Sequence, residues 1–243
     1  MLSIFYKEIN AFFSSLIGYF VVGVFLIFMG LTLFVFPQTS LLEYNFATLD
    51  QLFDLAPMVF MFLIPAITMR SFAEERQNGT IELLSTRPIG DLMIVSGKFL
   101  ACLTLVTFAL LPTLLYYVTV HELGSPPGNL DSGAIMGSYL GLFLLSAVFV
   151  AIGVFASSLT DNQIVAFILA TFLCFFIFYG FFYFSELPFF LGKGDDVVQM
   201  FGIDYHYRSI SRGIIDSRDV IYFISVIGLF VFFTLLSLDR QKG

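Results

Sequence analysis

The fold is decided by a charge-dense segment, residues 70–91, which reads RSFAEERQNGTIELLSTRPIGD. Long apolar runs lie on both sides of it, at residues 52–69 and 99–120. Almost everything else in the chain has the character of a membrane protein. This segment is therefore the part best suited to meet a soluble partner, and it is either a passive connector or a docking surface.

The composition indicates that lipid covers much of the surface. The 243-residue chain is 58% hydrophobic and 12% charged, with a mean hydropathy of +0.94, whereas soluble domains carry about 25% charged residues. The net charge of −7 and the lack of a basic stripe argue against nucleic acid as a partner. Cys102 and Cys174 both fall inside apolar runs, so we expect no disulfide and no metal site.

Six apolar runs each approach the roughly 20 residues that cross about 30 Å of hydrocarbon. They are residues 16–36, 52–69, 99–120, 134–158, 164–184 and 220–238. The runs predict an all-α membrane protein, with six transmembrane helices in a single domain over residues 1–243. The second run contains Pro57 and Pro65, so we expect it to be kinked, with neighbouring helices covering the freed carbonyls.

The N-terminal segment has its own pattern. Residues 1–15 mix apolar side chains with Lys7, Glu8 and Asn10. This amphipathic pattern favours a helix that lies in the membrane interface. A plain extension of the first span fits the pattern nearly as well.

Lysine and arginine counts predict the orientation, because cytoplasmic loops carry an excess of both. Seven fall on one side and four fall in a single long loop on the other. The seven are Lys7, Arg70, Arg76, Arg87, Lys98, Arg240 and Lys242. The four are Lys193, Arg208, Arg212 and Arg218. Both termini and residues 70–91 are therefore predicted to be cytoplasmic.

The charge-dense segment begins as a continuation of the second span. Residues 71–77 can extend that helix beyond the membrane. Asn78-Gly79 then supplies a stop, because both residues tolerate positive φ. At the other end of the segment, Asp91 is placed to cap the third span.

Between these points the pattern predicts a short and nearly isolated helix. Thr80 can cap it, and Glu82 in its first turn is favoured by the helix dipole. Arg87-Pro88 ends it, because the residue before proline avoids the α region. Its apolar side is made by Ile81, Leu83 and Leu84.

Two further segments connect the later spans. Residues 159–163, LTDNQ, form a tight inner turn in which Thr160 or Asp161 can cap the fifth helix. Residues 185–219 form a long outer segment that ends in YHYRSISRGIIDSRD. It mixes aromatic, apolar and basic side chains, so it can fold back as short amphipathic or re-entrant helices over the outer mouth.

Several kinds of chemistry are absent from the sequence. No Walker A motif, HExxH, CxxC or GxSxG pattern occurs, so the chain carries no ATPase motif and we expect no catalytic residues and no cofactor. His121 and His206 fall far apart in outer loops. The six runs hold no interior charge, with Asp54 at an outer end coming nearest, which argues against an ion-coupled transporter.

A membrane bundle without an energy source, but with a cytoplasmic helix between two spans, suggests that a partner supplies the energy. In that case Ile81, Leu83 and Leu84 enter a groove of the partner while Arg76 and Glu82 orient the helix. The alternative is a helix that lies on lipid head groups. The residues alone favour neither.

At these residues the sequence resembles a known family. Residues 69–89, MRSFAEERQNGTIELLSTRPI, are similar to the signature between spans two and three of ABC type-2 permeases, the membrane subunits of ABC exporters. The residues at the family's spacing are Glu75, Arg76, Gly79, Thr80, Glu82, Leu83 and Pro88. The inner turn at 159–164 and the residues Arg212-Gly213-Ile214-Ile215-Asp216 with Arg218-Asp219-Val220 resemble it too. Through the run at 162–167, the chain resembles most the gliding-motility-associated permease subunit of Bacteroidetes.

The resemblance implies roles that the residues alone do not show. It implies a coupling helix at Glu75, Arg76, Gly79, Thr80, Ile81, Glu82, Leu83 and Leu84, docked on a cytoplasmic ABC ATPase subunit. A second inner contact falls at Thr160, Asp161, Asn162 and Gln163, and an outer re-entrant region holds His206, Arg208, Arg212, Gly213, Asp216 and Arg218. A second membrane subunit completes the complex, either another copy or a distinct permease with a large outer domain. The setting implied is the bacterial inner membrane.

Two functions follow from these observations. The first is a permease subunit of an ATP-driven exporter, or of an ABC machine that does mechanical work at the envelope. The second is a non-transporting scaffold or assembly factor that holds an envelope partner through residues 185–219. A channel is a weaker third option, because no ring of charge marks a selectivity filter.

Overall fold

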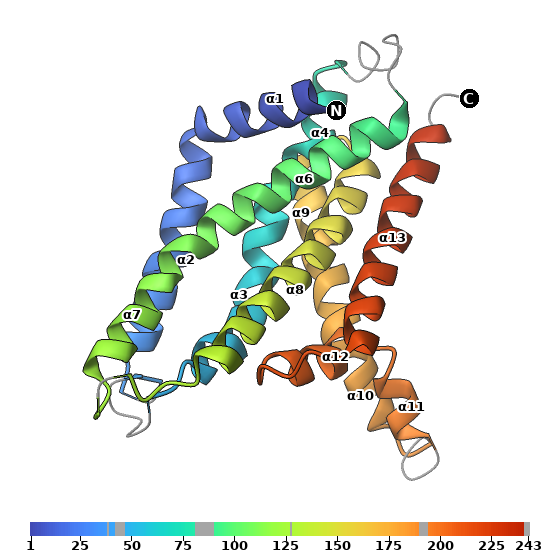
Figure 1. The fold of residues 1–243 in the computed structure, drawn as a ribbon. Helices are drawn as coiled ribbons and strands as arrows, with labels where there is room; N and C mark the ends of the chain where they lie inside the picture. The colour runs from blue at the N-terminus through green and yellow to red at the C-terminus, as the bar shows by residue number, and fades with distance from the viewer. Residues whose placement is uncertain (38, 42–46, 81–89, 127, 190–193, 241–243) are drawn as a thin grey trace.

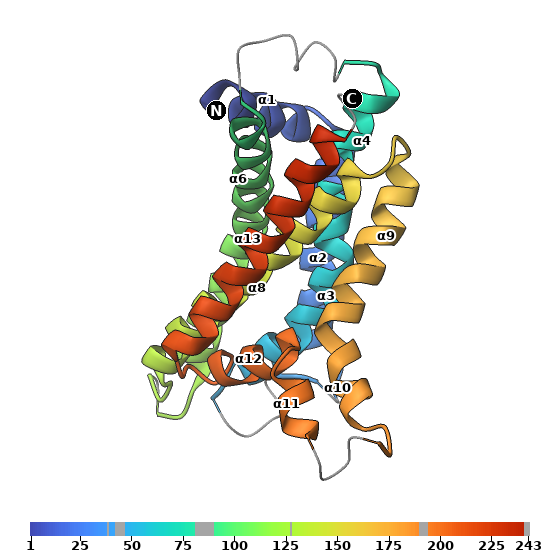
Figure 2. The same cartoon turned by 90° about the vertical axis from the view of Figure 1, so that its right-hand side faces the viewer.

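The computed structural model describes residues 1–243 except 38, 42–46, 81–89, 127, 190–193 and 241–243. The described chain is a bundle of long helices and contains no strand (Figure 1). One end of the bundle holds α1, α4 and the last turn of α13, and we call it the base. The opposite, far end holds α7, α11 and α12 (Figure 2).

The elements follow one another in chain order. They are α1 (Leu2–Phe13), α2 (Leu16–Phe34), α3 (Asp50–Thr68), α4 (Arg70–Gln77), α6 (Asp91–Leu110), the 3₁₀ turn η1 (Leu111–Thr113), α7 (Leu114–Leu123), α8 (Ser132–Ser158), α9 (Gln163–Phe175), the π turn η2 (Phe176–Gly180), α10 (Phe181–Ser185), α11 (Asp195–Gln199), α12 (Ile203–Ile210) and α13 (Ser217–Asp239).

The predicted membrane helices are present in the structure. Five helical stretches of the described chain are long and apolar enough to cross a membrane. A sixth candidate is the pair formed by α1 and α2, which is bent by 69°. The N-terminal residues therefore form a helix that points in a different direction from the helix of the first span, and they are not a straight extension of it. That α1 lies in the membrane interface stays a prediction.

Two helices are longer than the apolar runs that predicted them. The second begins at Asp50 and continues through α4 to Gln77 as a 28-residue helical stretch, which confirms that residues 71–77 extend the helix of the predicted span at 52–69. The third helix begins at Asp91, before the predicted start of the span at residue 99, so Lys98 lies within the helix near the base. That the spans hold no interior charge stays a prediction. Lys98 is tolerated because carboxylates from other helices surround it, as described below.

The fifth span is interrupted where its sequence is most aromatic. One turn with π geometry, Phe176–Gly180, separates α9 from α10. Such turns widen a helix locally and change the direction of its side chains. This turn faces α12 at the far end, where Phe178 packs near Tyr207 with ring centroids 6.1 Å apart.

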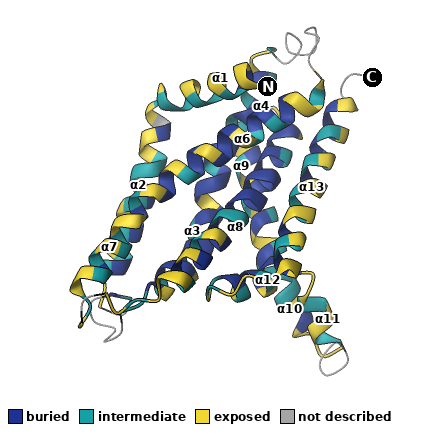
Figure 3. Ribbon diagram, in the orientation of Figure 1, coloured by how far each residue is buried: buried dark blue, intermediate teal, exposed yellow. Residues whose placement is uncertain are grey.

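Helix α8 forms the centre of the bundle. In its most apolar window 78% of residues are buried, against 22% in the α9–α10 stretch and 17% in α13 (Figure 3). It packs against α3, α6, α9 and α13. Small residues permit this, since a Cβ on Gly153 would lie 2.0 Å from the Thr68 hydroxyl of α3.

The proline-containing α3 is supported as expected. Pro57 has no N–H, so the carbonyl of Phe53 one turn earlier loses its helical partner. The Tyr207 hydroxyl of α12 donates a hydrogen bond to that carbonyl at 2.7 Å. The prediction that a neighbouring helix covers a freed carbonyl is confirmed at this position, and the bond fixes α12 across the far end of α3.

Candidate coupling site

A buried lysine joins three helices at the base. The Lys98 side chain is fully buried, and its ammonium lies 2.6 Å from a Glu8 carboxylate oxygen of α1 and 2.9 Å from one of Glu75 in α4. It also donates a hydrogen bond to the Ser71 carbonyl and lies 5.0 Å from the Phe72 ring centroid. Buried charges persist where partners match them closely, and here one cation lies between two anions.

A second layer of ion pairs lies nearer the surface. Lys7 of α1 contacts the other Glu75 oxygen at 2.6 Å. Burial alone would lower the pKa of Lys7, but the hydrogen bond and charge of Glu75 outweigh it and raise that pKa. Arg70 pairs with Glu74 at 2.8 Å and donates to the Ser15 hydroxyl at 3.0 Å. Helix α4 is therefore tied to α1 at two levels.

The end of α4 has the geometry that its sequence predicts. Gly79 has φ of +65°, and its N–H donates to the Arg76 carbonyl at 3.0 Å. The Thr80 N–H donates to the Glu75 carbonyl at 2.8 Å, which completes a Schellman motif. The predicted stop at Asn78-Gly79 is confirmed. The remaining predicted coupling residues, Ile81, Glu82, Leu83 and Leu84, lie outside the described residues, as does Arg87-Pro88.

Helix α4 is also attached to the base of α8. The Ser157 hydroxyl donates to the Met69 carbonyl at 2.9 Å and accepts from the Phe72 and Ala73 amides. Arg76 donates a hydrogen bond to the Ser158 carbonyl. A single serine thus bridges the joint between α3 and α4, so the two helices act as one unit.

The inner turn differs in detail from the prediction. Asn162 caps α9, accepting from the Ile164 and Val165 amides at 2.9 and 3.4 Å. Neither Thr160 nor Asp161 does so. The Thr160 hydroxyl instead accepts from the Asn162 amide at 3.1 Å, because Thr160 lies two residues before the cap position. Gln163 is the first helical residue.

The start of the third span also differs. Gly90 occupies the cap position with extended backbone, and Asp91 is the first residue inside α6. Asp91 therefore does not cap the helix, although its charge still lies at the positive end of the helix dipole. Of the two residues that flank the undescribed residues 81–89, Thr80 donates its N–H to the carbonyl of Glu75, a member of the ion network, and Gly90 begins the helix that holds Lys98.

At the far end, the outer segment packs onto the bundle through small residues. Gly213 has φ of +81°, and its carbonyl would lie 2.8 Å from a Cβ on Gly137 of α8. Asp216 caps α13, accepting from the Arg218 amide at 2.9 Å. The prediction that the segment folds over the bundle in short helices is confirmed by α11 and α12 (Figure 1). Whether it re-enters the membrane stays a prediction.

His206 is held on three sides. Its ring nitrogens lie 2.7 Å from an Asp219 carboxylate oxygen and 2.9 Å from the Met200 carbonyl. Its ring stacks on Tyr222 with centroids 3.9 Å apart. Arg208 pairs with Asp204 of the same helix at 2.8 Å. The contacts of His206 with Asp219 and Tyr222 fasten α12 to α13.

The sequence did not reveal the centre of the base network. Lys98 looked like the polar boundary of a span because its partners, Glu8 and Glu75, come from distant parts of the chain. A signal was available nevertheless. The residues between Asp91 and Lys98 are mostly apolar, so the helix could have been started a full two turns earlier.

The fold and the base together define a multi-pass membrane protein that carries no ATPase motif. The sequence profile of the ABC-2 family transporter proteins matches residues 2–188. The chain therefore belongs to the ABC-2 transporter family, and it is a membrane permease subunit of an ABC transporter. A search of curated proteins found no match.

Proposed function

We propose that a separate cytoplasmic ATPase drives this permease through residues 81–89, with the base of the bundle facing the cytoplasm. The observation that supports this most strongly is the buried network of Lys98, Glu8 and Glu75. It joins the two helices that flank residues 81–89 to each other and to α1. Both the family membership and the lack of a Walker motif agree with an external energy source.

The geometry offers a route by which motion at the base reaches the far end. Helices α3 and α4 form one 28-residue stretch, Asp50–Gln77, which is about 42 Å long at 1.5 Å per residue. Its base is clamped by Glu75, and its far end contacts α12 through the Phe53 carbonyl. A force on residues 81–89 would therefore tilt α3 and α12 together.

Three further parts of the proposal rest on resemblance and charge. The excess of lysine and arginine at the base supports cytoplasmic termini in a bacterial inner membrane. A second membrane subunit, either a copy of this chain or a distinct permease with a large outer domain, completes the complex. The resemblance of the run at residues 162–167 supports a place in a gliding-motility machine or another envelope machine.

Co-purification tests the partner. The tagged full chain is isolated in mild detergent as wild type, as Glu82→Lys, and as Glu122→Lys, a control charge reversal at the exposed far end. We expect an ABC ATPase with wild type and Glu122→Lys, and about tenfold less with Glu82→Lys, the effect of losing roughly 1.4 kcal/mol of binding. An ATPase that is absent from wild type, or retained in full by Glu82→Lys, would refute the proposal.

The scaffold function has one observation in its favour. Apolar side chains of the outer segment are exposed at the far end, including Val197, Phe201 and Ile214, at 59%, 61% and 62%. A scaffold would lose function on deletion of residues 192–212 and keep it in Glu82→Lys. The permease function predicts loss of activity in Glu82→Lys at normal expression.

A further inference from the structure

A charged cavity of about 670 Å³ opens at the far end, and the coupling proposal makes no use of it. It lies between the first turns of α3, the π turn and α12. Its charges are divided between two walls. Asp50 and Asp54 come from α3, while Arg208 and Arg212 come from α12 and the turn that follows it.

The charges of this cavity are only partly matched. Arg208 is used within its own helix, pairing with Asp204 and lying 5.4 Å from the Phe182 ring centroid. Burial raises the pKa of Asp204, and Arg208 partly offsets that rise. Among the residues that the structure describes, the side chains of Asp50, Asp54 and Arg212 form no hydrogen bond or ion pair; Arg212 acts on Asp54 only through its charge.

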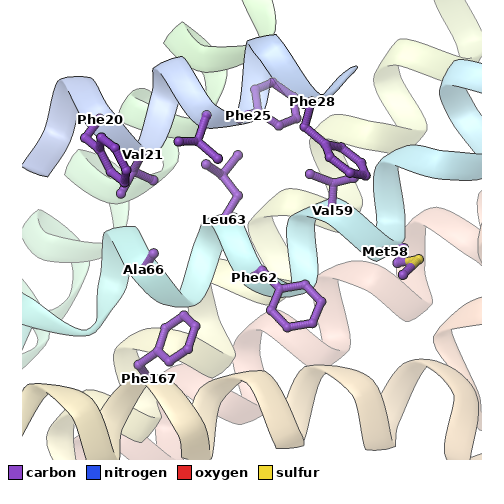
Figure 4. A pocket seen from close by; sticks show the side chains of 11 residues that line it. Phe20, Val21, Phe25, Phe28, Met58, Val59, Phe62, Leu63, Ala66 and Phe167 are labelled. Atoms are coloured by element: carbon purple, nitrogen blue, oxygen red, sulfur yellow. The ribbon is translucent and has the colours of Figure 1, made fainter. Parts of the chain in front are cut away.

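An apolar groove begins where the charged cavity ends. Tyr179 lines both the cavity and a groove of about 440 Å³ between α3 and α9, which also contains Met58, Phe62 and Phe167. These last three side chains also line a second groove of about 460 Å³, on the α2 side of α3 (Figure 4). Polar atoms are almost absent from both grooves. The charged cavity therefore adjoins the groove between α3 and α9, and that groove in turn adjoins the one on the α2 side of α3.

This arrangement is complementary to an amphiphile with a zwitterionic head. Carboxylates on one wall suit an ammonium group, and a free guanidinium on the other suits a phosphate, which arginine binds through paired N–H groups. Apolar grooves that start at the same place suit acyl chains. An anionic lipid would instead place an unmatched negative charge near Asp50 and Asp54.

We propose that the far end binds a phospholipid with a zwitterionic aminophosphate head group, of which phosphatidylethanolamine is the simplest. Its ammonium lies between Asp50 and Asp54, its phosphate contacts Arg212, and its acyl chains follow α3 through the two grooves. This site goes beyond the proposed coupling function and needs no ATP. Only the leaflet that supplies the lipid depends on the proposed orientation.

Native mass spectrometry of the full chain in detergent tests the site. The chain is titrated with dioleoyl phosphatidylethanolamine, with dioleoyl phosphatidylglycerol, and with soluble glycerophosphoethanolamine. We expect the first to bind at least about tenfold more tightly than the second, because only its head group carries an ammonium that can pair with Asp50 and Asp54. The Asp50→Asn, Asp54→Asn double variant should remove that preference, and Arg212→Gln should weaken the binding of both lipids.

A matched pair of variants tests the grooves. Ile168→Trp fills the groove beside Phe172, whereas Ile221→Trp adds the same bulk on α13 at a position that is 63% exposed. Only Ile168→Trp should weaken the binding of phosphatidylethanolamine. Equal binding of the two lipids by wild type would overturn the proposal, even if a variant failed to fold. Binding of glycerophosphoethanolamine as tight as that of the lipid would overturn it as well, because the grooves would then contribute nothing.

Discussion

The two ends of the bundle both collect opposite charges, but they arrange them differently. At the base, Lys98 is fully buried and lies within 3 Å of two carboxylates. At the far end, Asp54 and Arg212 face a cavity of about 670 Å³ without hydrogen-bonding each other. The base uses its charges to hold helices together, and the far end leaves charges available to a ligand.

The difference has a physical basis in desolvation. Burying a charge costs several kcal/mol unless partners replace its water, so a closed network is stable only when every member is present. Charges that line an open cavity keep their water and cost little until a ligand displaces it. Matched burial therefore indicates a structural joint, and facing charges without partners indicate a binding site.

The largest expected effect is at the base. Lys98→Met removes the shared cation of the buried Glu75 and the partly buried Glu8, so we expect a loss of about 3–5 kcal/mol in unfolding free energy. Lys7→Met is the matched control, because the Lys7 side chain is 56% exposed and its pair is worth only about 0–1 kcal/mol. Melting followed by circular dichroism compares the two. Equal losses would show that the buried network contributes no more than a surface pair.

A smaller effect of the opposite sign is expected at the far end. Asp50 and Asp54 are like charges four residues apart on α3, an arrangement that destabilises a helix by about 0.2–0.5 kcal/mol. Asp54→Asn should therefore leave the melting temperature unchanged or raise it slightly. The control is Arg208→Gln, which leaves the largely buried Asp204 carboxylate without its cation and should lower the melting temperature. A destabilised Asp54→Asn variant would mean that Asp54 serves the fold, against the binding site proposed here.

Local chemistry made parts of the structure predictable. The stop at Asn78-Gly79 follows from residues that accept positive φ, and Gly79 adopts +65°. Pro57 has no N–H, so the sequence predicts that another group must bond the carbonyl it frees. The sequence did not show that the Tyr207 hydroxyl donates that hydrogen bond. Long apolar runs located the membrane helices, because their signal lies within a single stretch of chain.

Features made by distant residues were not predictable in this way. Lys98 meets Glu8 across 90 positions, and its charge alone did not show that it is buried between three helices. The far-end cavity joins residues 50–54 to residues 204–212, so neither segment shows it alone. The prediction of the cap of α9 was wrong for a different reason. Thr160, Asp161 and Asn162 are all good cap residues, and the helix begins after Asn162, so only that residue takes the cap position.

The central claim is that the base moves as one unit when a partner ATPase acts on residues 81–89. Hydrogen–deuterium exchange of the co-purified complex, with and without ATP, tests it most directly. We predict that exchange changes together in residues 2–13 and 70–80, because Lys98 joins α1 to α4 through Glu8 and Glu75. A change confined to residues 70–80, with α1 unaffected, would contradict the claim.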